Sequence, residues 1–197
     1  MQVEFSPGNL DESGRGFVAH QWEKGGYFGW GTGKDPSNKS ENWLDYPKFN
    51  DWGDSIEGSW RTLSYYECGY LLHYRPEAEE KVALGTVNDV RGLILLPDNW
   101  NLPKGCTFVA GKNGWNGNVY TVEQWQVMER AGAVFLPAAG GRNDAGVFGG
   151  YWLSTPSDGI RAWELYFDED HVFREWIKRI DAHSVRLVRN SGIRNGI

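Results

Sequence analysis

The chain has 197 residues, of which 40% are hydrophobic, with 26 glycines, 11 tryptophans and a formal net charge of −6. This length predicts one domain with a substantial core, and the aromatic content argues against intrinsic disorder. The acidic balance argues against a nucleic-acid partner, and no apolar stretch in the sequence is long enough to predict direct insertion into a membrane. The first residues, MQVEFSPGNL, lack the pattern of a signal peptide.

The first part of the chain is expected to form one short strand followed by long ordered loops. Residues 2–6 alternate apolar and polar side chains, as a half-buried strand does. Residues 11–59 are rich in Gly, Asn, Asp and Ser and carry no periodic apolar stripe. Large aromatic side chains in this segment are expected to hold the loops in place, namely Trp22, Phe28, Trp30, Trp43 and Trp52.

Two capping-box patterns, in which a Ser or Thr precedes a Glu or Gln by three residues, predict two helices. Ser64 and Glu67 predict a helix over 64–74, and the pattern at 121–124 predicts a second helix over 122–131. The apolar stripe of the first helix consists of Leu63, Tyr66, Tyr70, Leu71 and Tyr74.

Residues 82–87 are followed by a turn at 88–89, and short apolar runs bounded by turn residues predict buried strands over 92–96 and 133–136. Together with the helices, these strands predict an α+β fold in which two helices flank a small sheet. The repeated order of helix, buried strand and proline is too degenerate to indicate a solenoid.

The end of the chain is expected to form a pair of strands over 162–167 and 184–189, because both segments alternate. In the first of them Trp163 faces the same side as Leu165 and Phe167, whereas Glu164 and Tyr166 face the other side. The second strand places Val185 and Leu187 inward and Arg186 outward. The acidic segment 168–170 lies between the two strands and is expected at the surface. Alternation at both ends of the chain also predicts that the N- and C-terminal strands lie close together.

No motif indicates a cofactor or a metal. Cys68 and Cys106 have no metal-ligand spacing; two free thiols are favoured, and one disulfide remains an alternative. The four histidines are scattered through different segments. Three consecutive carboxylates at 168–170 could hold calcium, but they lack the shaped set of oxygen ligands, and a solvated turn is the favoured interpretation. We therefore expect folding without a metal or an organic cofactor.

The segment 151–189 mixes large aromatic side chains, arginines and carboxylates outside any long periodic pattern. Such side chains dominate the energetics of binding surfaces. The same composition also fits an irregular β-region whose aromatic side chains are core. Composition alone leaves these two interpretations nearly even.

Several motifs, taken together, resemble the Bacteroides-type "major paralogous domain" proteins: FSPGNL, FGWGTG, WRTLS, GLILLPDNW, AGAVFLPAAGGR and SVRLVR. The resemblance covers nearly the whole chain. It implies a single C-type lectin-like domain over 1–197, related to the formylglycine-generating-enzyme type. FGGYWLST at 148–155 also resembles the start of the variable region in proteins diversified by retroelements, which implies a variable, ligand-binding region over 151–183.

The resemblance also implies which side chains form the constant frame and which face a ligand. The frame residues are Gly149, Gly150, Trp152, Leu165, Phe167, Val185 and Leu187. The ligand-facing candidates are Tyr151, Leu153, Ser157, Asp158, Ile160, Arg161, Trp163, Glu164, Tyr166, Asp168, Asp170, His171, Phe173, Arg174, Trp176 and Lys178. We expect several of the large and charged candidates to form one contiguous exposed face, namely Tyr151, Arg161, Trp163, Glu164, Tyr166, Phe173, Arg174 and Trp176.

The function expected from this resemblance is non-enzymatic display of a ligand-binding surface, as in an adhesin or a phage receptor-binding protein on a virion or bacterial cell surface. The ligand would be a protein or a glycan on a target surface. Two alternatives remain. One is an enzyme of the formylglycine-generating class that has lost its cysteines, since no cysteine follows Cys106. The other is a structural surface or virion protein whose C-terminal segment packs against a neighbouring subunit.

Overall fold

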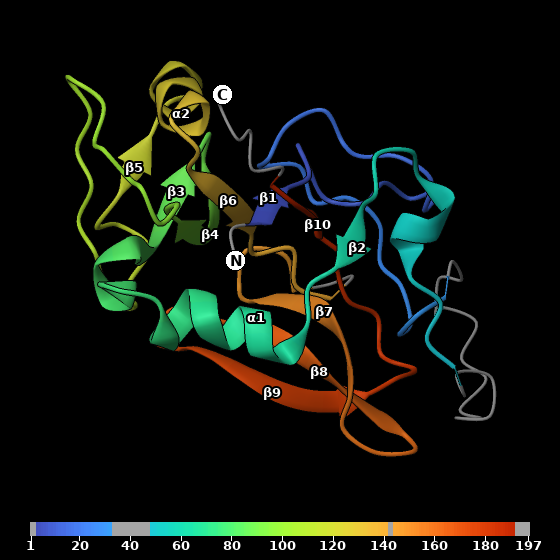
Figure 1. The fold of residues 1–197 in the computed structure, drawn as a ribbon. Helices are drawn as coiled ribbons and strands as arrows, with labels where there is room; N and C mark the ends of the chain where they lie inside the picture. The colour runs from blue at the N-terminus through green and yellow to red at the C-terminus, as the bar shows by residue number, and fades with distance from the viewer. Residues whose placement is uncertain (1–2, 33–47, 142–143, 192–197) are drawn as a thin grey trace.

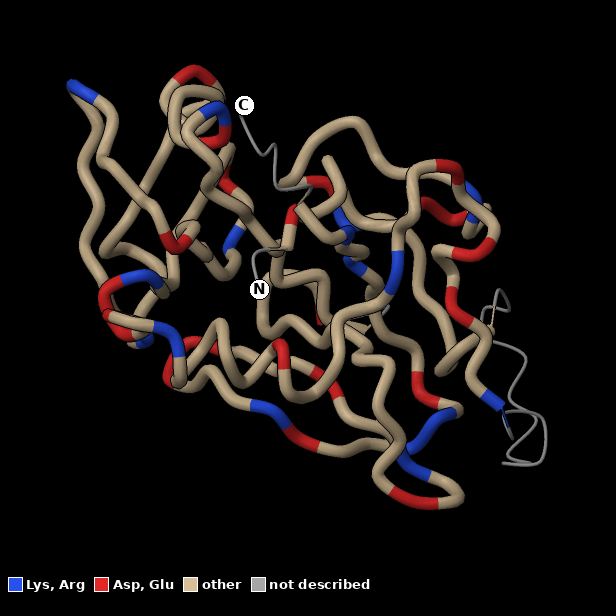
Figure 2. Tube along the Cα trace, in the orientation of Figure 1, with Lys and Arg blue, Asp and Glu red and all other residues tan. Residues whose placement is uncertain are grey.

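The computed structural model describes residues 3–32, 48–141 and 144–191, and in these ranges it is an α+β structure with three small sheets and two short α-helices (Figure 1). The predicted fold class is thereby confirmed at this level. Lys and Arg are interspersed with Asp and Glu along the chain (Figure 2).

The first sheet joins the two ends of the described chain. Its strand order is β1 (Val3–Phe5), β10 (Leu187–Asn190) and β2 (Arg61–Thr62), and both pairings are antiparallel. The side chains of Glu4 and Arg189 form an ion pair across β1 and β10, with 2.7 Å between oxygen and nitrogen. The prediction that the N- and C-terminal strands lie close together is confirmed.

The second sheet has the strand order β5, β3, β4, β6 and packs against helix α2. Its elements are β3 (Val82–Val87), β4 (Val90–Leu95), β5 (Val119–Tyr120), α2 (Val122–Arg130) and β6 (Val134–Pro137). The capping box at 121–124 is present, and Trp125 and Met128 of the helix are buried with Phe135 of β6. The helix and the buried strands predicted over 92–96 and 133–136 are confirmed.

The third sheet is an antiparallel meander of β7 (Gly149–Pro156), β8 (Arg161–Phe167) and β9 (Val172–Lys178), and helix α1 (Tyr65–Gly69) packs on one of its sides (Figure 1). Ser64 and Glu67 form the predicted capping box of α1. The helix continues as a π-helical segment, η3 (Tyr70–Tyr74). Together they confirm a helical stretch over 64–74.

The first helix corrects one prediction, because the tyrosines of its expected apolar stripe do not all face the core. Tyr66 and Tyr74 are among the most exposed large side chains of the described structure, and the residues that the helix buries are Cys68, Gly69 and Leu72. The π-helical geometry of η3 changes the spacing of the side chains in this part of the helix.

The strands at the C-terminal end also differ from the prediction. Residues 161–167 pair with β7 and β9 rather than with 187–190, which belong to the first sheet. The acidic segment therefore closes the hairpin between β8 and β9. Arg186 was expected to point outward but is buried, because its segment lies against the N-terminal loop, where its guanidinium donates to Asn9 Oδ1 at 3.3 Å.

The loops of the first part of the chain are ordered by aromatic side chains, as predicted. Trp22, Phe28, Trp30 and Trp52 are buried, and Trp43 lies outside the described residues. Trp52 begins a short 3-10 helix, η2 (Trp52–Ser55). A second 3-10 helix, η4 (Ala78–Lys81), precedes β3. Cys68 and Cys106 are both free thiols, as favoured from the sequence.

Candidate ligand-binding face

The side of the β7–β8–β9 sheet that faces α1 carries a row of aromatic and arginine side chains. Trp163 of β8 pairs in register with Trp176 of β9. The Arg161 guanidinium lies 3.9 Å from the centre of the Trp176 ring, and the ring of Tyr65 in α1 lies 4.5 Å from that of Trp163. The guanidinium of Arg174 covers the other part of Tyr65 at 3.9 Å. We call these five residues the aromatic–arginine strip.

Hydrogen bonds hold the two arginines of the strip in place. Arg174 donates to the carbonyl oxygen of Tyr65 at 2.9 Å, which ties β9 to α1. Arg161 donates through Nε to Asp158 Oδ2 at 2.6 Å. The same carboxylate accepts from two backbone N–H groups of its turn, at Ile160 and Arg161. Hydrogen bonding to Arg161 and to this backbone lowers the pKa of Asp158, so the turn between β7 and β8 keeps its charge pair.

The aromatic–arginine strip has the composition and the order of a binding surface. Trp176 is 49% exposed, and Trp163 and Arg161 are partly exposed beside it. Trp, Tyr and Arg are the residues most enriched among binding hot spots. Stacked, hydrogen-bonded side chains lose less conformational entropy on binding than free ones, so more of the contact energy appears as affinity.

The other side of the sheet carries a separate group of aromatic side chains. The ring of Tyr166 lies 5.6 Å from that of Phe148 and 5.1 Å from that of Phe173. The Tyr166 hydroxyl donates to Asp168 at 3.2 Å, and burial, with the charge of Asp168, raises the pKa of Tyr166 to about 12. His171 stands beside Phe173 at the end of this group, with 6.1 Å between ring centres.

The expectation of one contiguous face is therefore wrong. Successive side chains of a strand point to opposite sides of its sheet, so Trp163 and Trp176 lie on the α1-facing side and Tyr166 and Phe173 lie on the opposite side. Of the remaining candidates, Lys178 pairs in register with Arg161 and extends the first group.

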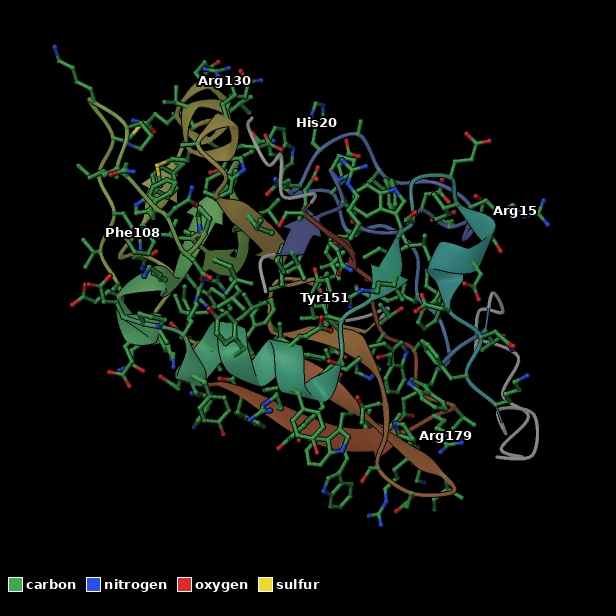
Figure 3. The ribbon with its side chains drawn as sticks, viewed as in Figure 1. Arg15, His20, Phe108, Arg130, Tyr151 and Arg179 are labelled. Atoms are coloured by element: carbon green, nitrogen blue, oxygen red, sulfur yellow. The ribbon has the colours of Figure 1, made fainter. Side chains whose placement is uncertain are left out.

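Three of the predicted ligand-facing residues are buried, and the sequence-based assignment of Tyr151, Leu153 and Glu164 to a surface is corrected. Tyr151 lies inside the molecule and donates its hydroxyl hydrogen to the carbonyl of Pro137 at 2.8 Å (Figure 3). Leu153 belongs to the core cluster beneath α1. The reason is that residues 149–153 of β7 are covered on both sides, by α1 and by the N-terminal loops, and only the end of the strand reaches solvent.

Glu164 is completely buried, with 0% of its side chain exposed, and faces His183. Glu164 Oε2 lies 2.8 Å from His183 Nδ1. The backbone of His183 pairs with Phe28, so this ion pair joins the central strand β8 to the N-terminal loops. Burial acts to lower the pKa of His183, but the charge of Glu164 and its hydrogen bond outweigh burial, and the pKa is raised.

The predicted frame residues are in place. Trp152, Leu165, Phe167, Val185 and Leu187 are buried. The two glycines of the GGYW motif are required by close approach: a Cβ atom on Gly149 would overlap with the Phe167 ring, and one on Gly150 would overlap with His183 Nδ1. The glycine pair thus reflects packing, and it keeps room for the buried Glu164–His183 pair.

The two turns that flank β8 hold the remaining candidates, and they lie at opposite ends of this strand. Ser157, Asp158 and Ile160 lie in the turn before it, close to Arg161. Asp168, Asp170 and His171 lie in the turn after it, where the Asp168 carboxylate accepts from the backbone N–H groups of the other two. Burial acts to raise the pKa of Asp168, but hydrogen bonds from the Asp170 backbone and from the side chains of His171 and Tyr166 outweigh it, and the pKa is lowered.

The acidic turn is closed by its own backbone, and in the described part of the chain no group of three or more His, Cys, Asp or Glu side chains is placed to hold a metal ion. We predict that a chelator leaves the thermal unfolding midpoint unchanged, because the sheets and their aromatic core need no ligand to form. Thermal unfolding followed by circular dichroism, with and without EDTA, measures this. A fall of several degrees with EDTA would contradict the prediction.

Sequence reasoning missed the contribution of α1. Tyr65 stacks on Trp163 and on Arg174, and it belongs to the candidate surface although it lies far from residues 151–183 in the chain. The signal was present in the cluster of tyrosines that follows the capping box, which was assigned to the core.

Comparison with known proteins finds no match to the chain among protein-family models, curated proteins or solved structures. Within the described residues, no helix has both the length and the apolar character needed to span a bilayer.

Proposed function

We propose that this chain is a non-enzymatic display protein of the adhesin or receptor-binding type that binds its ligand with the aromatic–arginine strip. Its domain is of the C-type lectin-like kind, as its sequence motifs suggest, and its variable region includes β8 and β9. The ligand is a protein or a glycan on a target surface. The observation that supports this most is the exposed Trp176, stacked under Arg161 and paired in register with Trp163.

A preorganised surface of this kind suits recognition, because its side chains are held by contacts with each other and not by a ligand. Arg161 is neutralised by Asp158 and Arg174 is bonded to α1, while Lys178 is exposed. The strip therefore offers flat aromatic rings and oriented N–H donors to a partner. Sugar rings and acidic or aromatic peptide side chains have the matching chemistry.

The test compares two exposed aromatic residues of the same strand. The full chain is labelled and screened on a glycan array and on a panel of intact bacterial cells. The affinity of the unchanged protein and of two variants is then measured for each glycan or cell type that binds the protein. Trp176→Ala should weaken binding by about tenfold or more, as expected for a hot spot. Phe173→Ala is the matched control, because Phe173 lies on the opposite side of β9.

The affinity of the control variant should lie within about threefold of that of the unchanged protein, since residues outside the centre of an interface contribute little to the binding energy. Both variants should keep the unfolding midpoint, because both side chains are exposed. Loss of binding with Phe173→Ala and not with Trp176→Ala would move the site to the opposite side of the sheet. The absence of binding to every glycan and cell surface would overturn the proposed function.

A further inference from the structure

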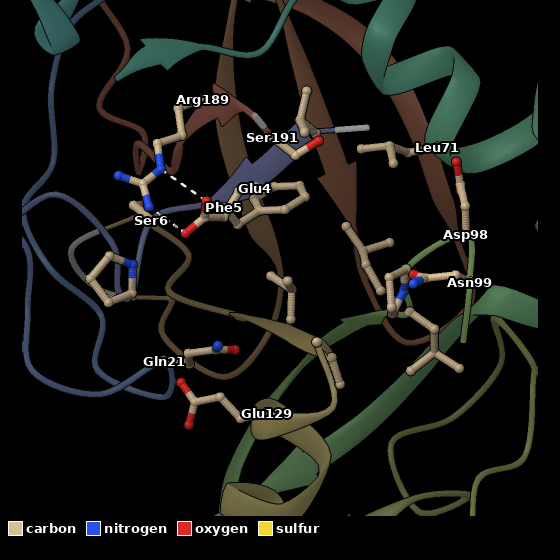
Figure 4. Close-up of a pocket in the computed structure, with 18 of the residues that line it drawn as sticks. Glu4, Phe5, Ser6, Gln21, Leu71, Asp98, Asn99, Glu129, Arg189 and Ser191 are labelled. Carbon is tan, nitrogen blue, oxygen red and sulfur yellow. Dashed lines mark hydrogen bonds and ion pairs between the residues drawn. The ribbon is translucent and has the colours of Figure 1, made fainter. Parts of the chain in front are cut away.

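A second candidate site lies away from the β7–β8–β9 sheet. A cavity of about 620 Å³ opens between β1, the helical segment η3 and the edge strand β6 (Figure 4). Binding pockets for small molecules typically enclose roughly 300–1,000 Å³. The walls come from segments that are distant in the sequence, so the cavity is a product of the fold. It shares no lining residue with the aromatic–arginine strip.

The walls are apolar in the middle and polar at the ends. Side chains of β1, η3, β4 and β6 form the apolar part, which includes Phe5, Leu71, Leu95 and Val134. Gln21 and Glu129 line one end, and Asp98 lines another (Figure 4). Tyr70 also lines the cavity and is hydrogen-bonded to Asp98. This distribution matches a ligand with an apolar body and polar groups at its ends.

Gln21 carries a hydrogen-bond donor whose direction is set by the bond that its side-chain oxygen makes to the backbone. Its side-chain oxygen accepts from the N–H of Phe135, a backbone group on the outer edge of β6. The amide oxygen must therefore face β6, which turns the amide nitrogen away from that strand and toward the cavity. Gln21 is 5% exposed, and within the described chain its amide nitrogen has no hydrogen-bond partner. An amide donor that lines the cavity without a partner in the described chain is available to a ligand that supplies an acceptor.

Glu129 places an acceptor at the same end of the cavity. It is half-buried on α2, and its carboxylate forms no ion pair or hydrogen bond with the described residues. The Gln21 donor and the Glu129 acceptor together match a group that has an acceptor and a donor side by side. A carboxamide and a vicinal diol both have this property.

The opposite end is electrically balanced. Arg75 is almost completely buried and donates to the carbonyl of Leu96 at 2.6 Å and to Asp98 Oδ1 at 3.3 Å. The Tyr70 hydroxyl donates to the other oxygen of Asp98 at 3.0 Å, and this bond raises the pKa of Tyr70. The charge of the Asp98 carboxylate is thus balanced by Arg75, and its orientation is fixed by the bonds to Arg75 and Tyr70.

The charges around the cavity disfavour an anion. Asp98 is paired with Arg75, and Glu4 is paired with Arg189. Glu129 is the one lining carboxylate that forms no close ion pair in the described chain, and its charge interacts electrostatically with the buried Arg186, which does not line the cavity. An anionic ligand would face this carboxylate, whereas an uncharged donor–acceptor group would bond both to it and to Gln21.

We propose that this cavity binds an uncharged amphipathic small molecule whose polar end carries a carboxamide or a vicinal diol. The polar end lies between Gln21 and Glu129, and the apolar body lies against Phe5, Leu71 and Val134. This site is independent of the ligand-binding strip, and it can be occupied whether or not the strip binds a surface ligand.

The test uses the full chain and small probes that share one aromatic ring. Benzamide carries the carboxamide and phenyl β-D-glucoside carries the diol, so these two probes separate the two sources of the same chemistry. Benzoate and benzylamine are the charged controls. Ligand-observed NMR titration should show saturable binding of benzamide or of the glucoside at millimolar concentration, with benzoate weaker by about tenfold or more.

Two variants locate the bound probe. Gln21→Glu keeps an oxygen for the Phe135 N–H but removes the amide donor, and Glu129→Gln removes the charged acceptor. Each variant should bind the neutral probe with an affinity about tenfold lower than that of the unchanged protein. Glu123→Gln is the control, because Glu123 lies on the same helix, is exposed and does not line the cavity. This variant should bind the probes as tightly as the unchanged protein.

Three results would overturn the proposal. They are no saturable binding of either neutral probe up to about 10 mM, binding of benzoate or benzylamine that is equal to or tighter than that of benzamide, or unchanged binding in Glu129→Gln. If Gln21→Glu fails to fold, Glu129→Gln and its control Glu123→Gln decide the question alone, because both positions lie at the surface of α2.

Discussion

Replacing Trp152 by alanine is expected to lower the free energy of unfolding by about 3–5 kcal/mol. The indole is 1% exposed and lies in the cluster that joins β7 and β8 to the N-terminal loops. Its Nε1 donates to the carbonyl of Phe28 at 2.7 Å, and its ring meets His183 edge-on at 5.1 Å between centres. Alanine would remove this contact area and leave the Phe28 carbonyl without its partner.

Trp176→Ala is the matched comparison, because it removes the same side chain from an exposed position. This variant should lower the free energy of unfolding by less than about 1 kcal/mol, because the indole mainly loses its solvent-exposed contact with the Arg161 guanidinium. Urea unfolding of both variants, followed by tryptophan fluorescence and circular dichroism, measures the difference. Equal losses for the two variants would show that the strip is part of the stabilising core and would argue against its role in binding.

Local patterns predicted the parts of the fold that local interactions build. The capping boxes at 64–67 and 121–124 are both formed, because each is closed by hydrogen bonds within four residues. The buried strands were recognisable because their apolar runs are short and bounded by turns. The meeting of the terminal strands followed from alternation at both ends of the chain.

Strand β9 was not predictable from its sequence. Residues 172–178 place aromatic and charged side chains on both sides, with Phe173 and Glu175 on one side and Arg174 and Trp176 on the other. No apolar face emerges from such a pattern. This strand is an edge of its sheet, and edge strands commonly carry charges that oppose further pairing.

The burial of Tyr151 and Glu164 depends on contacts that are distant in sequence. Tyr151 is hydrogen-bonded by Asn9 and to the carbonyl of Pro137, and the Glu164 carboxylate lies in ion-pair distance of His183. A single sequence assigns a carboxylate to the surface by default, because burial of a lone charge is unfavourable. The pairing partner becomes visible only when the fold brings the segments together, and the same holds for the cavity beside Gln21.

Glu164→Gln is expected to destabilise the protein by about 3–5 kcal/mol at pH 6, because it leaves the charged His183 buried without its partner. The loss should become smaller as the pH rises toward 9. His183 has a raised pKa in the folded state because the attraction of Glu164 outweighs the effect of burial. A group with a raised folded-state pKa contributes its full stabilisation below its unfolded value, here 6.5, and loses it as the pH rises through the folded-state pKa.

Urea unfolding at several pH values between 6 and 9 measures this dependence, and Glu175→Gln is the control. Glu175 lies beside Glu164, and burial, reinforced by the charge of Glu164, raises the pKa of its carboxyl group. Replacing Glu175 by a neutral amide should leave the free energy of unfolding similar or slightly higher. The part of the stability that depends on the titration of His183 should remain. A loss in Glu164→Gln that is equal at both ends of the range would mean that His183 is neutral in the folded protein. The pair would then act as a neutral hydrogen bond and not as a buried ion pair.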